Sequence, residues 1–161
     1  MVDIDGDMTD IGALVAADHA EIRQHFVELH RDTDTPGVRR ALVRDLLTDL
    51  TAHCEAEQRT VYRVVEDQLG RDAAEALRRD HDELDRLIGA VLDARGEPQQ
   101  RSVLADLERC ARAHMDREEQ EILPRLAERI GIKGRSSLAL AYAQTQDAYS
   151  SVVVRRSGRA G

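Results

Sequence analysis

The sequence is poor in aromatic residues, and this shortage argues against several kinds of binding surface. Only 2% of the 161 residues are Phe, Trp or Tyr, and tryptophan is absent. Surfaces for single-stranded nucleic acid need aromatic side chains on which bases stack. The formal net charge of −8 is also unfavourable, because nucleic acids are bound through basic patches. We therefore expect no nucleic-acid partner.

Long apolar runs are missing as well. No segment approaches the ~20 apolar residues that a membrane-spanning helix needs. The first residues, MVDIDGDMTD, are acidic and lack the apolar run of a signal peptide. With only two cysteines, Cys54 and Cys110, a disulfide framework is not indicated. We expect a cytoplasmic protein with free thiols and no membrane contact.

Charge and helical periodicity dominate what is present. Charged residues make up 34% of the chain, above the ~25% of an average domain, which favours solvated helices over a β-sandwich. Apolar residues recur at helical spacing in four segments, and no strand pattern is visible before residue 132. The predicted helices cover approximately Asp10 to His30, Pro36 to Leu69, Asp72 to Arg95 and Pro98 to Ile130.

The short loops between these segments predict the topology. Sequential helices joined by short loops are antiparallel neighbours, so the expected fold is an all-α, up-down-up-down four-helix bundle. We expect this bundle to occupy residues 1–131. Residues 132–161 form a C-terminal extension, for which a short fifth helix over SSLALAYAQTQDAY and a disordered tail are both compatible with the sequence.

Six polar residues interrupt the apolar stripes of these helices. In each case the spacing of three or four residues continues through the polar residue, so its side chain should point into the bundle. Burying such groups is costly unless they are paired or bind a metal ion. A single histidine–glutamate pair is more typical of a surface contact, but here two pairs and two further histidines share this placement. The candidate metal ligands are His19, His53, Glu57, His81, His114 and Glu118.

An internal repeat strengthens the case for a shared site. Residues 18–22 (DHAEI) resemble residues 80–84 (DHDEL), and the spacing His-x-x-x-Glu occurs at residues 53–57 and again at residues 114–118. Each half of the chain is therefore a helical hairpin with the same order of candidate ligands. Two such hairpins related by a pseudo-twofold axis would bring all six together. Imidazole and carboxylate suit iron, while manganese and zinc are also compatible with this spacing.

The order of these residues resembles the hemerythrin-like (HHE) cation-binding family over about residues 10–130. The segment from Glu118 to Pro124 also resembles the family. The resemblance implies a non-haem di-iron centre with an oxo or hydroxo bridge. It further implies that the histidines of each hairpin bind one iron and that both glutamates bridge the irons, which pairs His19 with His53, His81 with His114, and Glu57 with Glu118.

One departure from the family bears on activity. Oxygen-carrying members have a further histidine on the third helix, four residues from the other, and these positions are Leu77 and Asp85 here. Leucine cannot bind a metal, and we expect Asp85 to be a solvated charge. Both irons would then keep an open position, which favours reaction with O2, H2O2 or NO in oxidative or nitrosative stress. The alternatives are a reversible O2 store, a sensor of O2, NO or iron without turnover, and a structural bundle that binds zinc or no metal. Whether the protein is an enzyme stays open.

Four further residues are candidates for the surroundings of the site, and most are expected to lie outside it. On an ideal helix Tyr62 lies 180° from His53 and faces away from the metals, unless the helix is distorted. His25 and His30 are expected outside the site. Cys110, one turn before His114, either lines the pocket or fills the core.

Overall fold

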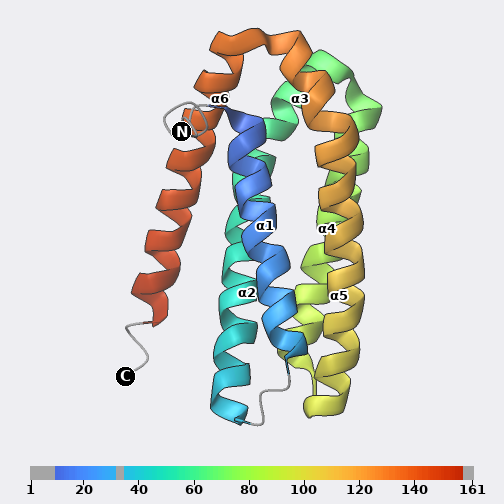
Figure 1. Cartoon of the computed structure of the whole chain (residues 1–161), viewed down its shortest axis with the longest axis vertical. Helices are drawn as coiled ribbons and strands as arrows, with labels where there is room; N and C mark the ends of the chain where they lie inside the picture. Colours follow the sequence, from blue (N-terminus) through green and yellow to red (C-terminus); the bar gives the residue numbers. More distant parts are fainter. Residues whose placement is uncertain (1–9, 32–34, 158–161) are drawn as a thin grey trace.

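In the computed structural model, which describes residues 10–31 and 35–157, four helical rods pack side by side as a bundle (Figure 1). No strand occurs within those residues, so the predicted all-α fold class is confirmed. Neighbouring rods run in opposite directions because the connections between them are short. None of the described helices is both long and apolar enough to cross a membrane.

Two of the rods are single α-helices and two are composite. The single helices are α1 (Ile11–His30) and α4 (Arg71–Asp93). In the second rod, α2 (Pro36–Ala56) continues through the π-helix η2 (Glu57–Val61) into α3 (Tyr62–Leu69). In the fourth, α5 (Glu97–Arg117) continues through η3 (Glu118–Ile122) into α6 (Leu123–Ser157). Each composite rod is therefore interrupted at a candidate glutamate ligand.

The last helix, α6, is bent at Gly131 and returns along the bundle. Gly131 has φ 62° and ψ −177°, a conformation that is accessible essentially only to glycine. After this bend α6 passes over one end of the bundle and descends beside α1 and α2 (Figure 1). The descending part contains the segment SSLALAYAQTQDAY, and residues 158–161 of the extension lie outside the described residues.

Two separate apolar clusters form the core, and the candidate ligands lie between them. One cluster contains Ile22 and Leu84, and the other contains Val15 and Leu77. His19 lies between Val15 and Ile22 on α1, just as His81 lies between Leu77 and Leu84 on α4. The bundle therefore carries a polar layer that is shielded from solvent by apolar packing on both sides.

A π-helical turn follows each His-x-x-x-Glu segment. The backbone N–H of Tyr62 donates to the carbonyl of Glu57, and that of Leu123 donates to the carbonyl of Glu118. These bonds span five residues instead of four, so each turn takes in one extra residue and changes the phase of the helix that follows. Single π-turns inside α-helices are frequent at functional sites.

Candidate metal centre

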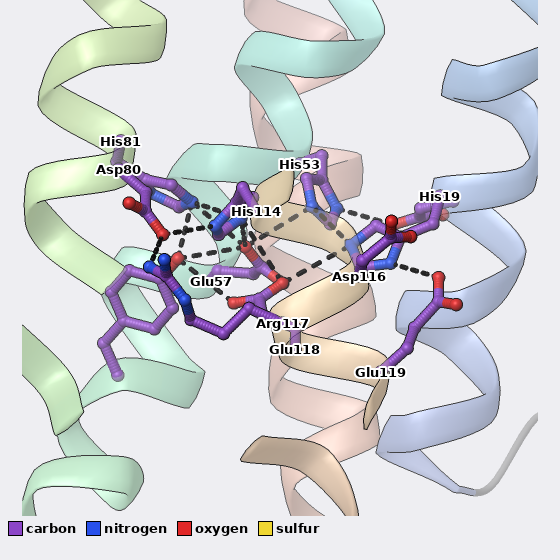
Figure 2. Close-up of polar contacts among 12 residues, drawn as sticks. His19, His53, Glu57, Asp80, His81, His114, Asp116, Arg117, Glu118 and Glu119 are labelled. Carbon is purple, nitrogen blue, oxygen red and sulfur yellow. Dashed lines mark hydrogen bonds and ion pairs between the residues drawn. The ribbon is translucent and has the colours of Figure 1, made fainter. Parts of the chain in front are cut away.

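All six candidate ligands converge at the middle of the bundle. They come from all four rods, and their side chains point toward one another (Figure 2). Each is at most 1% exposed. The helical spacing therefore placed every one of these side chains on the correct, inward face.

The four histidines form two pairs. The Nε2 atoms of His19 and His53 are 3.2 Å apart, and those of His81 and His114 are 3.1 Å apart. Each pair joins the two helices of one hairpin, which is the pairing that the family resemblance implies. Two imidazole nitrogens at this separation can both be directed at one ion.

Each glutamate lies between the two histidine pairs. The Oε2 atom of Glu57 is 3.3 Å from His53 Nε2 and 3.2 Å from His81 Nε2. The Oε2 atom of Glu118 is 3.4 Å from both His19 Nε2 and His114 Nε2. The result is two buried His/Glu clusters that share Glu57, an arrangement consistent with a binuclear metal site.

Unpaired oxygen atoms in this layer show that the residues fit a cation. Glu57 Oε1 and Glu118 Oε2 are buried and have no hydrogen-bond partner within the described part of the chain. A buried carboxylate oxygen left without a partner costs at least ~1–3 kcal/mol, and a cation would supply the missing partner. The mixed nitrogen and oxygen donor set suits iron, and also manganese or zinc.

The side chain of the residue directly after each glutamate contacts the Nδ1 atom of a histidine in the other hairpin. The Nδ1 atom of His19 is 2.7 Å from Glu119 Oε1, and Arg23 donates to the same oxygen at 2.8 Å. At the matching place in the repeat, Gln58 Nε2 is 3.1 Å from His81 Nδ1. Such contacts fix the orientation of a ligating imidazole ring.

The remaining two histidines face aspartates that are also related by the repeat. Asp18 Oδ2 is 3.5 Å from His53 Nδ1, and Asp80 Oδ2 is 3.6 Å from His114 Nδ1. On the first side the hydroxyl of Tyr142 intervenes, because its oxygen is 2.8 Å from His53 Nδ1. The two halves of the centre are therefore similar but not identical.

Two of the buried histidines have pKa values shifted in opposite directions. Burial and the nearby His53 lower the pKa of His19 to about 4. Burial alone would lower the pKa of His114, but the carboxyl groups of Glu118 and Asp80 raise it to about 10. Without metal, His114 therefore carries a proton at neutral pH and His19 does not.

The pKa values of the two glutamates are shifted in opposite directions. Burial and the neighbouring Glu57 carboxylate raise the pKa of Glu118 well above its ordinary value. Burial opposes ionisation of Glu57 too, but His53 and His114 prevail and hold the pKa of Glu57 well below its ordinary value. The metal-free layer therefore favours the ionised form of Glu57 and the protonated form of Glu118. A metal ion that binds both as carboxylates must displace protons.

The expectation that Tyr62 faces away from the site is wrong. Its hydroxyl oxygen is 2.5 Å from His81 Nε2, 3.2 Å from Glu118 Oε1 and 3.4 Å from Glu57 Oε2. The cause is the π-turn η2, which adds one residue and places Tyr62 on the same face as Glu57. Burial, with the neighbouring Glu118 and Glu57, raises the pKa of Tyr62 well above its ordinary value.

The other residues weighed in the sequence lie outside both clusters. His25 Nε2 is 2.7 Å from Asp49, and His30 Nε2 is 2.6 Å from Glu108. Asp85 is exposed on α4. Cys110 is partly buried and packs against the apolar cluster that contains Ile22 and Leu84. Both Cys110 and the buried Cys54 are free thiols.

Sequence reasoning missed the residues that hold the histidines. The repeat could have revealed most of them, because Asp18 and Asp80 precede the lone histidines, and Gln58 and Glu119 follow the glutamates. Tyr142 carried no such signal, because it lies beyond the repeat.

Comparison with known proteins identifies the region that contains the site. The sequence profile described as the hemerythrin HHE cation binding domain matches residues 10–126, well over half of the chain. The matched range includes all six candidate ligands and confirms the resemblance predicted from their order. Searches of curated proteins and of solved structures gave no match.

Proposed function

Because the chain belongs to the hemerythrin HHE cation-binding domain family, we propose that it is a non-haem di-iron protein that binds and reacts with O2, H2O2 or NO. Such a reaction would serve in the handling of oxidative or nitrosative stress. The single observation that carries this proposal is the pair of buried His/Glu clusters that share Glu57.

The contacts support one assignment of the ligands. One ion would lie at His19 and His53, the other at His81 and His114, and both glutamates would bridge. Glu57 and Glu118 each lie within 3.2–3.4 Å of a histidine from both pairs, which favours the bridging role. When bound, iron would supply exchange between ferrous and ferric states and positions for a small ligand.

The buried Leu77 next to the histidines supports the proposal that the metal ions keep open coordination positions. Leu77 is fully buried one turn before His81 and offers no donor atom. Asp85, one turn after His81, is exposed and belongs to neither cluster. With two histidines and two shared carboxylates, the protein supplies few donors to each ion, and this leaves room for O2, H2O2 or NO.

Tyr62 supports reaction over reversible storage. Its hydroxyl lies beside His81 Nε2 and donates toward both glutamates. Because its pKa is raised, this hydroxyl keeps its proton at neutral pH and can donate a hydrogen bond to a ligand in the layer. Removal of a fixed hydrogen-bond donor that stabilises developing charge typically slows a reaction ~10²–10³-fold.

The two free thiols support a reducing compartment. Cys54 is buried and Cys110 is partly buried, and both are free. Disulfides are rare in the cytoplasm, where thiols stay reduced. We therefore place the protein in the cytoplasm as part of the same proposal, to be tested by fractionation of cells that express it.

Metal analysis tests the centre, and gas and peroxide reactions test its activity. Protein loaded with ferrous iron without oxygen should contain two irons per chain, and a stable content of none or one at full occupancy would overturn the two-metal centre. The ferrous protein should be oxidised by air, and the ferric form should consume H2O2 or the ferrous form NO. Oxygen uptake that argon reverses would instead favour an oxygen store.

A further inference from the structure

One polar side chain reaches the metal centre from outside the region that the family profile matches. Tyr142 lies on the descending part of α6, beyond residue 126, and is only 1% exposed. Its neighbours Leu138 and Ala139 are buried in the apolar cluster that contains Val15 and Leu77, so this part of α6 is packed against the bundle.

The Tyr142 hydroxyl joins a candidate ligand to an aspartate. It donates to Asp18 Oδ2, and its oxygen lies 2.8 Å from His53 Nδ1. Gln146, one turn further along α6, donates to the same Asp18 oxygen at 2.5 Å. Since the hydroxyl proton is directed at Asp18, the tyrosine oxygen accepts from His53, which places the imidazole proton on Nδ1.

This contact prepares His53 for metal binding. With its proton on Nδ1, the imidazole presents an unprotonated Nε2, the atom that faces His19 and Glu57 at 3.2 and 3.3 Å. The hydrogen bond also restrains rotation of the ring. A contact of this kind typically changes metal affinity by ~10–100-fold.

The second half of the centre has no counterpart to this contact among the described residues. There His114 Nδ1 faces Asp80 at 3.6 Å and has no hydrogen-bond partner in the part of the chain that the structure describes, and Asp80 is paired with Arg117 from α5. All three residues belong to the bundle itself. Only the His53 side of the centre depends on a helix that packs against the bundle from outside.

We propose that Tyr142 is a positioning residue for the metal ion at His19 and His53, and that packing of α6 on the bundle is linked to occupation of that site. Linkage is reciprocal, so a contact that aids metal binding must itself be strengthened by the bound metal. The inference rests on the proposed two-metal function. It adds that the two ions are held unequally and that the C-terminal helix responds to one of them.

A pair of tyrosine variants on the same helix tests the inference. Tyr142→Phe removes the hydroxyl but keeps the buried ring. Tyr149→Phe is the matched control, because Tyr149 lines a surface groove with Val43 and Leu47, away from the ligands. In iron-loaded protein mixed with a chelator, Tyr142→Phe should release one of its two irons ~10–100-fold faster than the wild type. The control should release both at wild-type rates.

Two further readouts separate positioning from simple loss of packing. In the zinc-loaded protein, NMR should show a slowly exchanging Nδ1 proton for His53, and Tyr142→Phe should shift it or abolish its protection. Amide hydrogen exchange over residues 138–149 should slow on zinc binding in the wild type and respond less in the variant. Should Tyr142→Phe fail to fold, Gln146→Leu removes the other donor to Asp18 and should change metal release in the same direction.

The outcomes distinguish this inference from the proposed function. A wild-type protein that holds fewer than two metals overturns both. The wild type can instead hold two metals while Tyr142→Phe releases iron at the wild-type rate and zinc binding leaves amide hydrogen exchange in α6 unchanged. That result overturns the role of Tyr142 but not the two-metal centre.

Discussion

Replacing Glu118 with glutamine should stabilise the metal-free protein and weaken its metal binding. Burial and the Glu57 carboxylate raise the pKa of Glu118 well above its ordinary value, so the folded metal-free protein favours the neutral acid form of this side chain. In the unfolded chain it ionises at its ordinary value of 4.5. The folded state therefore binds the extra proton, and stability from this group falls as pH rises above 4.5.

The size of the effect follows from the pH interval. Each pH unit above 4.5 over which folded Glu118 stays protonated costs the wild type ~1.4 kcal/mol that Glu118→Gln would keep. For a chain of this length each 1 kcal/mol so kept raises Tm by about 2–4 °C. Glutamine keeps the shape and a neutral carbonyl oxygen that can still accept from the Tyr62 hydroxyl.

Thermal unfolding with and without metal is the assay. In chelator, the difference in unfolding free energy between variant and wild type should be smallest near pH 4.5 and should grow as the pH rises toward 7. With ferrous iron under anaerobic conditions the order should reverse, because a neutral amide binds a cation more weakly than a carboxylate. Glu121→Gln is the control, since Glu121 is exposed and should change stability by less than ~0.5 kcal/mol.

A metal-free Glu118→Gln protein that is less stable than the wild type at pH 7 would refute the reasoning. So would a stability difference that does not change between pH 4.5 and pH 7. Either result would mean that Glu118 is ionised in the metal-free layer.

Three further outcomes are expected. Glu57→Ala should lower iron content more than His19→Ala, because Glu57 contacts both histidine pairs, while His25→Ala should leave iron content unchanged; elemental analysis of purified variants checks this order. Chelation should lower Tm, because each site at a free metal concentration 100 times its Kd adds ~2.7 kcal/mol; a Tm unmoved by chelator would contradict a buried centre. Tyr62→Phe should keep two irons yet consume peroxide ~10²-fold more slowly in stopped flow, and an unchanged rate would remove Tyr62 from the reaction.

The sequence was sufficient for the bundle and for the inward placement of the six polar residues, because helical spacing alone determines which face a side chain occupies. Their role as ligands stays a prediction. An ideal helix of 3.6 residues per turn would turn Tyr62 away from the site, whereas η2 adds one residue and brings it in. Pro124, which cannot donate a backbone hydrogen bond, lies next to η3, but its counterpart in the first half is Arg63, so no proline lies next to η2. Tyr142 lies 89 residues from His53, and no local pattern connects the two.

The division of the ligands between two matched hairpins has a consequence for the order of folding. Each hairpin supplies both histidines of one pair, but each pair also needs a carboxylate from the opposite hairpin, as Glu118 beside His19 shows. A complete site therefore exists only after the hairpins have docked, a late event if each hairpin forms from local contacts first. Bound metal would then stabilise the contact between two hairpins that have already folded. It would slow unfolding without accelerating folding. On this account a newly made chain folds empty and acquires its metal afterwards.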